Sequence, residues 1–169
     1  MRRCITRGVP EVYIPLAYNN NFQIVQSPGY LAILYEWMHE TRVIPLDGQP
    51  QLPGHVRQWL GSPRGHWEGD TLVVVTTNFT NKADFRGAGE NLRLVERFTP
   101  VGPDSIDWSA TVEDPTTWTR PWTFAIPLTR DTTQQWIFEF ACHEGNYSLP
   151  HILSGARAKE KAEAEAKQK

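Results

Sequence analysis

The chain has 169 residues, of which 40% are hydrophobic and 21% charged, and its 17 Lys and Arg nearly balance its 19 Asp and Glu. This length suits a single domain with its own core, and this composition excludes a wholly disordered chain. The net charge of −2 offers no basic surface of the kind that binds nucleic acid, and no apolar run reaches the ~18 residues of a membrane-spanning helix.

β-Strand signals dominate the chain from residue 22 onwards. A turn is predicted at Ser27-Pro28-Gly29-Tyr30, between the strands Phe22–Gln26 and Tyr30–His39. Pro in the second position and Gly in the third position predict a type II turn. Arg42–Leu46 continues as a short, edge-like strand. His55–Leu60, which follows a loop rich in Gly and Pro, favours one or two helical turns.

A tight hairpin opens the second part of the β pattern. Gly69-Asp70, with Gly in the first turn position, predicts a type II′ hairpin between residues 66–68 and 71–77. Four further strands follow, and in each one the even-numbered positions are mostly apolar and the odd-numbered ones mostly polar. Because successive side chains of a strand point to opposite faces, each has one dry and one wet face. These strands are Asn91–Thr99, Ser105–Glu113, Pro121–Thr129 and Gln134–His143.

About eight to nine antiparallel strands in sequential order predict an all-β fold, a meander that forms a closed barrel or a sandwich. Of these we expect a small lipocalin-like barrel, formed by residues 1–153 as a single domain. Residues 154–169 carry five basic and three acidic side chains but no apolar stripe. This composition predicts a solvated helical or disordered tail, and we expect a charged helix there.

The two cysteines, Cys4 and Cys142, are far apart and in no metal-binding spacing. A disulfide between the N-terminal arm and the last predicted strand, in an oxidising compartment, fits this sequence. Two separate reduced thiols fit it equally. His39 and His143 are each followed by a glutamate, but neither dipeptide continues into an H-E-x-x-H motif. We therefore predict no metal site and no cofactor.

Aromatic residues on the dry faces define a candidate pocket. Trp108, Trp122 and Trp136 lie on three successive predicted strands, where they are either plain core or the lining of a cavity for one small ligand. Tyr35 joins this predicted ligand-binding set, as does Arg120 at the start of a strand. Arg120 can orient an anionic or carbonyl group, or it can stack on an aromatic ring and only fix its loop.

Glu96 is the one carboxylate on the otherwise apolar face of Asn91–Thr99. A buried carboxylate must be paired with a cation, hydrogen-bonded or protonated. With His39 and His143, which end their predicted strands, Glu96 is a candidate acid–base group. The alternative is a structural pair with an arginine or a tryptophan indole. Under both interpretations we expect Glu96 to face inward, within hydrogen-bonding reach of a His, Arg, Trp or Tyr side chain.

The run Gly-His-Trp-Glu-Gly-Asp-Thr-Leu-Val-Val at residues 65–74 resembles the G-x-W-x-G-D-T-L-V-V pattern of an uncharacterised family of bacterial proteins. The similarity extends over most of residues 4–157, and it includes segments 78–80, 90–92, 95–98, 118–122 and 141–147. The resemblance implies a periplasmic or extracellular protein but no activity. Residues 1–8 lack the apolar stretch of a signal peptide. More loosely, the strand pattern resembles lipocalin-type barrels, which is an analogy of fold alone.

Three functions stay open at this point. The first is binding of a small, mostly apolar or amphipathic molecule in an aromatic-lined barrel cavity. The second is an acid–base enzyme (a hydrolase, isomerase or lyase) on the same barrel, which uses Glu96 with a histidine at the rim. The third is a structural or interaction module of a larger exported protein, whose interior is filled by side chains.

Overall fold

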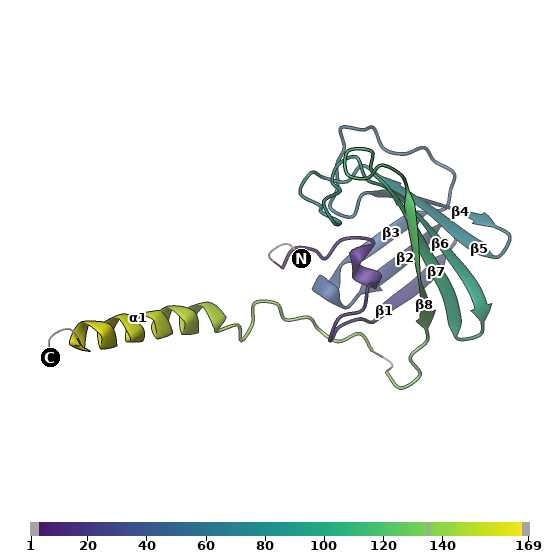
Figure 1. Cartoon of the computed structure of the whole chain (residues 1–169). Helices are drawn as coiled ribbons and strands as arrows, with labels where there is room; N and C mark the ends of the chain where they lie inside the picture. The colour runs from purple at the N-terminus through teal and green to yellow at the C-terminus, as the bar shows by residue number, and fades with distance from the viewer. Residues whose placement is uncertain (1–3, 135, 167–169) are drawn as a thin grey trace.

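The computed structural model describes residues 4–134 and 136–166, so the last three residues of the predicted tail lie outside it. It contains two antiparallel sheets and a C-terminal helix (Figure 1). In each sheet the strands follow one another in chain order, so each sheet is a simple meander. The first sheet consists of β1 (Phe22–Ser27), β2 (Tyr30–Tyr35) and β3 (Thr41–Pro45), and the second of β4 (Ser62–Glu68), β5 (Thr71–Thr77), β6 (Arg93–Gly102), β7 (Ser105–Glu113) and β8 (Trp122–Thr129).

The mostly β, antiparallel fold with a C-terminal helix is as predicted, but the described residues form no closed barrel. The two sheets meet where β3 packs beside β4 without sharing a hydrogen-bonded ladder. Gly65 of β4 lies at this junction, where an added Cβ atom would be 2.6 Å from Leu46 Cδ2 and 3.0 Å from Ile44 Cγ2. The close approach of the sheets therefore depends on a residue without a side chain.

Both predicted hairpins are present, and their glycines have the backbone conformation that the turns require. Gly29 joins β1 to β2 with a φ of 77°, and Gly69 joins β4 to β5 with a φ of 59°. Glycine adopts positive φ without the steric cost that a Cβ atom imposes. The local turn chemistry thus fixes the register of the two hairpins.

The alternation also predicted correctly which faces of β6, β7 and β8 are dry. Leu94, Trp108 and Ala110 are completely buried, whereas Trp122 and Phe124 on the edge strand β8 are half-buried. The register pairs even-numbered residues with even-numbered residues across both ladders. These strands therefore share one apolar face.

The predicted strand Gln134–His143 is wrong, because the described residues of this segment form no strand. Trp136 and Phe138, expected in the core, are 77% and 60% exposed. After β8 the Asp131 carboxylate accepts hydrogen bonds from the amides two and three residues later, in a turn that precedes this segment. The Phe138 amide then donates to the Glu36 side chain rather than to a neighbouring strand. Residues 55–60 likewise form turns and no helix.

An N-terminal arm, residues 4–21, lies where a barrel would need a closing strand. Its short 3-10 helix η1 (Glu11–Tyr13) places Val12 and Tyr13 in the core. The Tyr13 ring contacts Phe22 of β1 and Trp108 of β7, so it spans the gap on the side opposite the β3–β4 junction. We call this gap, between the free edges β1 and β8, the seam. Tyr13 packs at the seam between β1 and β7, and both strand edges are without a ladder partner among the described residues.

Helix α1 (Ser148–Ala166) extends away from the sheets, and none of its described residues is buried (Figure 1). It begins at Ser148, upstream of the predicted start of the tail. Exposed pairs of Lys159 with Glu163 and Lys161 with Glu165, each at 3.9 Å, lie along it. No helix in the described part of the chain is long and apolar enough to cross a membrane.

We expect Gly65→Ala to destabilise the fold by about 1–3 kcal/mol, the usual cost of forcing an extra carbon into a packed site. The reason is the 2.6 Å approach of the new Cβ to Leu46 at the junction of the sheets. Urea unfolding measures the loss. Gly102→Ala, where nothing lies within 4 Å of the added carbon, is the control. Equal stability of the two variants would contradict this account of the junction.

Candidate functional site

A polar cluster lies in the core between the two sheets. It consists of Arg42 from β3, Thr76 from β5, Glu96 from β6, and the tyrosines Tyr13 and Tyr35, and we call it the interior cluster. Arg42 Nη2 donates to Glu96 Oε2 at 2.5 Å and to Thr76 Oγ1 at 2.6 Å. The two charged side chains are no more than 1% exposed. An ion pair thus joins the first sheet to the second inside the core.

Strand register explains why these side chains meet. Glu96 is paired with Val74 of β5 and Ala110 of β7, both on the buried face. Arg42 lies two residues before Ile44, so both point to the buried face of β3. The prediction that Glu96 faces inward beside a His, Arg, Trp or Tyr is confirmed, and the partner is an arginine.

The tyrosines of the cluster are held neutral by their surroundings. Their hydroxyl oxygens are 2.7 Å apart. Burial raises the pKa of Tyr35 to about 12 and raises the pKa of Tyr13 well above its ordinary value. Burial works to lower the pKa of Arg42, but the interactions of Arg42 with Glu96, Tyr35 and Tyr13 together outweigh burial and raise that pKa. At neutral pH the cluster therefore holds a cationic arginine and two phenol groups that keep their protons.

Some buried polar atoms in and beside the cluster make no hydrogen bond with any described residue. They are Arg42 Nε and Nη1, Glu96 Oε1 and the indole nitrogen of Trp108. Trp108 is the diagonal neighbour of Glu96, because Phe98 pairs with Trp108 and Glu96 with Ala110. Each unmade bond of this kind costs about 1–3 kcal/mol. The site therefore offers three donors and one acceptor to any polar group that reaches it.

Aromatic side chains extend from the cluster along β7 and β8. Trp108 contacts Phe124 with ring centroids 5.5 Å apart, and Phe124 contacts Trp122 at 5.4 Å. Phe85 stacks on Trp122 at 6.1 Å. A polar centre with an apolar flank is the usual make-up of a small-molecule site.

The structure brings together Glu96, Tyr35 and Trp108 of the predicted site residues, with Trp122 on the adjoining aromatic surface. Arg120 is instead exposed in the loop before β8. Trp136 is exposed outside any strand, so its predicted place in a pocket wall is wrong.

Sequence reasoning missed Arg42 and Tyr13. The position of Arg42 two residues before Ile44 was the available signal for Arg42. No periodicity marks the segment around Tyr13.

His39 and His143 come together, but away from Glu96. Both are exposed and line a shallow surface depression of about 220 Å³, together with the glutamates Glu139 and Glu144. The proposed acid–base set of Glu96 with these histidines is therefore not assembled in one place. Among the residues that the structure describes, no three or more His, Cys, Asp or Glu side chains are grouped to hold a metal ion.

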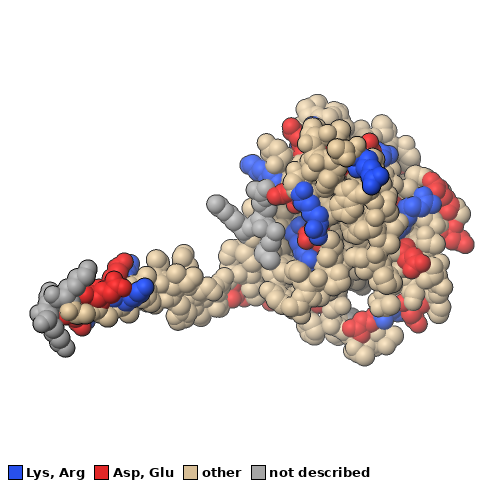
Figure 2. Space-filling view, viewed as in Figure 1, with Lys and Arg blue, Asp and Glu red and all other residues tan. Residues whose placement is uncertain are grey.

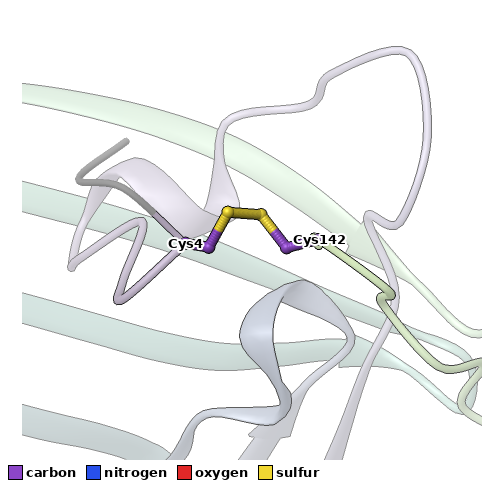
Figure 3. Close-up of a disulfide and its surroundings, with 2 residues drawn as sticks. All are labelled: Cys4 and Cys142. Carbon is purple, nitrogen blue, oxygen red and sulfur yellow. A yellow bond between two sulfur atoms is a disulfide. The ribbon is translucent and has the colours of Figure 1, made fainter. Parts of the chain in front are cut away.

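A disulfide joins Cys4 to Cys142 (Figure 3). Both cysteines line the same depression. Of the two alternatives for the cysteines, the bonded one is therefore found, with Cα atoms 5.9 Å apart. The bond fastens the start of the N-terminal arm to the segment that follows β8.

A second buried carboxylate, Glu36, also holds the segment that follows β8. It accepts hydrogen bonds from the amides of Phe138 at 3.1 Å and Asn21 at 3.2 Å, and from Gln134 Nε2 at 3.0 Å. Burial raises the pKa of Glu36, but these bonds outweigh burial and hold the pKa below its ordinary value. Glu36 thus acts as an anchor for the segment after β8.

On the face shown in Figure 2, Lys and Arg are interspersed with Asp and Glu over the body of the molecule. A second shallow depression, of about 420 Å³, is lined by Arg130, Asp131, Thr132 and Gln134. Neither depression is lined by residues of the interior cluster.

A comparison of the chain with protein-family models, with curated proteins and with solved structures found no match.

We expect Arg42→Met to cost about 3–5 kcal/mol, because it leaves Glu96 as a buried charge without its partner. Adding Glu96→Leu should restore much of the loss, since the double variant leaves no buried charge. Chemical unfolding of the two variants and the wild type measures the coupling. Arg97→Met, which breaks the exposed pair with Glu68, is the control and should change stability far less. A double variant less stable than Arg42→Met would contradict the pairing.

The pH dependence of the Glu36 anchor follows from its lowered pKa. A carboxylate whose pKa is lower in the folded than in the unfolded state contributes stability above the ordinary carboxylate pKa. That contribution is lost as the pH falls through the lowered value. We expect the hydrogen-exchange protection of the Phe138 amide to fall over this acidic range. In a Glu36→Gln variant the protection should be lower at neutral pH and nearly independent of pH. Constant protection in the wild type would disprove the anchor.

Proposed function

We propose that this protein binds a small, mostly apolar molecule that carries a polar group, in the space between its two sheets. The observation that carries the proposal is the interior cluster, with its three donors and one acceptor that no described residue satisfies. A core selected for stability alone gains little from a buried ion pair, because apolar residues of similar volume do as well or better. A polar centre beside an aromatic surface instead suits recognition.

The charges of the cluster restrict the class of ligand. Arg42 and Glu96 neutralise each other, so a charged group on the ligand would be buried without a counter-ion, at high cost. A neutral group that accepts from Arg42 or Trp108 and donates to Glu96 avoids this cost. A carboxamide or an α-hydroxyketone has both capacities, and the rest of the molecule would lie along the aromatic surface.

In this mode of binding the two sheets act as an open, lipocalin-like barrel. The N-terminal arm takes the place of the strand that would close it. The Tyr13 ring lies 4.4 Å from the Trp108 ring, centroid to centroid, and so occupies the position from which a ligand would reach the cluster. A ligand therefore needs the arm to move aside.

The acid–base alternative has less support. Glu96 is paired with Arg42, and the two candidate histidines line another surface. The interaction-module alternative rests on one specific observation, the exposed Trp136, Phe138, Tyr147 and Leu149 on the segment after β8 and the start of α1. The disulfide supports the periplasmic or extracellular location in either case, because such bonds persist in oxidising compartments.

Nile red, a neutral dye whose emission rises in apolar surroundings, tests the proposal. We expect saturable binding that decanamide displaces more effectively than decanoate, because the carboxylate adds an uncompensated charge. Trp108→Phe keeps an aromatic ring but removes the indole N–H, so decanamide should compete roughly 2–10-fold less well, the value of one hydrogen bond.

Trp67→Phe, on the exposed side of β4, is the matched control and should leave competition unchanged. Failure of the dye to bind with the disulfide either intact or reduced would reject ligand binding and favour the interaction module.

A further inference from the structure

We infer that the N-terminal arm is a gate over the interior cluster and that the Cys4–Cys142 disulfide locks this gate. The inference rests on the proposed function, because it concerns access to the same site. It assigns a role to two features that ligand binding alone leaves unused, the disulfide and the surface depression beside it.

The gate is the part of the arm that enters the seam. Val9, Val12 and Tyr13 are buried there, and the Tyr13 ring packs on Trp108 while its hydroxyl pairs with that of Tyr35. These contacts are made by side chains and not by a strand ladder. An arm held in this way can leave the seam without breaking any backbone pairing within either sheet.

The lock is at the start of the arm. Cys4 is bonded to Cys142, and Arg7 packs over the Trp37 ring and donates to the backbone oxygen of Ile14. While the disulfide is intact, both ends of the arm are fixed, so it can leave the seam only as a closed loop. Once the bond is broken, no covalent link among the described residues closes this loop. A segment held in a closed loop has less conformational freedom than the same segment without the link, so reduction favours the open state.

The disulfide is placed where a reductant can reach it. Both cysteines are only half-buried and line the open depression of about 220 Å³ that His39 and His143 also line. By contrast, the interior cluster is fully covered. A thiol can thus act on the lock while the gate is closed.

The reaction is thiol–disulfide exchange with a dithiol. One thiolate of the dithiol attacks a sulfur of the Cys4–Cys142 bond, which breaks to give a mixed disulfide and one cysteine thiolate. The second thiolate of the dithiol then attacks the mixed disulfide and releases the other cysteine. The dithiol is oxidised to a cyclic disulfide, Cys4 and Cys142 are reduced, and the two protons given up by the dithiol are taken up by the cysteines.

Nile red titrations of three forms test the gate: the oxidised protein, the protein reduced with dithiothreitol, and a Cys4→Ser/Cys142→Ser variant kept without reductant. We expect the reduced protein and the double variant to bind the dye about tenfold more tightly than the oxidised protein, since loop closure no longer opposes opening. Equal affinity in all three forms would overturn the gate and leave ligand binding intact. Absence of binding in every form would reject the proposed function, and the gate would fall with it.

Hydrogen exchange provides a readout that needs no ligand. The amides of Val12 and Tyr13 donate to Gly8 and Pro10 within the arm. On reduction these two amides should exchange at least several-fold faster, whereas the amides paired between β6 and β7 should keep their rates. Unchanged exchange in the arm would overturn the gate. Equally accelerated exchange in the strands would do so too, because the disulfide would then only stabilise the whole fold.

Discussion

The ion pair between Arg42 and Glu96 is the constraint on which the rest of the structure depends. It crosses from β3 to β6 with both groups buried, so it is favourable only if the sheets hold the two charges at hydrogen-bonding distance and exclude water. The junction at Gly65 meets the first requirement, since it lets β3 lie against β4 without an intervening side chain. The arm meets the second, because Tyr13 covers the pair from the seam.

The arm closes the molecule in a way that differs physically from the closing strand of a barrel. A strand ladder adds a row of backbone hydrogen bonds on each side, and its removal would leave both edges unpaired. The arm instead contributes the burial of side chains, among them Val9, Val12 and Tyr13, and a remote covalent bond. By the chain-entropy account, a disulfide that closes a loop of 138 residues stabilises the fold by about 5 kcal/mol. The covalent part of this closure can be removed in one chemical step, by reduction of the disulfide, whereas a ladder has no such single bond.

The strands and the inward position of Glu96 could be predicted because both depend on local alternation. Leu94, Glu96 and Phe98 alternate along β6, so the strand itself shows that they share one face, and all three are buried. Arg42 escaped prediction because its burial depends on which side of β3 meets the other sheet. The segment after β8 shows the opposite case, in which local alternation predicts a strand that does not form. Trp136 and Phe138 alternate as in a strand, but the acceptor for the Phe138 amide is the Glu36 side chain, a tertiary contact that no local pattern contains.

The energetics of the interior cluster connect its polar atoms to the arm that covers them. Four buried atoms that no described residue satisfies represent a cost on the order of 4–12 kcal/mol, comparable with the whole stability of a small domain. Water or the polar group of a ligand must supply the missing bonds, and opening of the seam admits either. The open state is thus favoured by hydration of the cluster and opposed by exposure of Val9, Val12 and Tyr13, about 1.5–3 kcal/mol for each side chain. Hydration of the cluster and exposure of these side chains are of similar size, so a modest additional contribution decides the position of the arm. The covalent bond at Cys4 provides such a contribution.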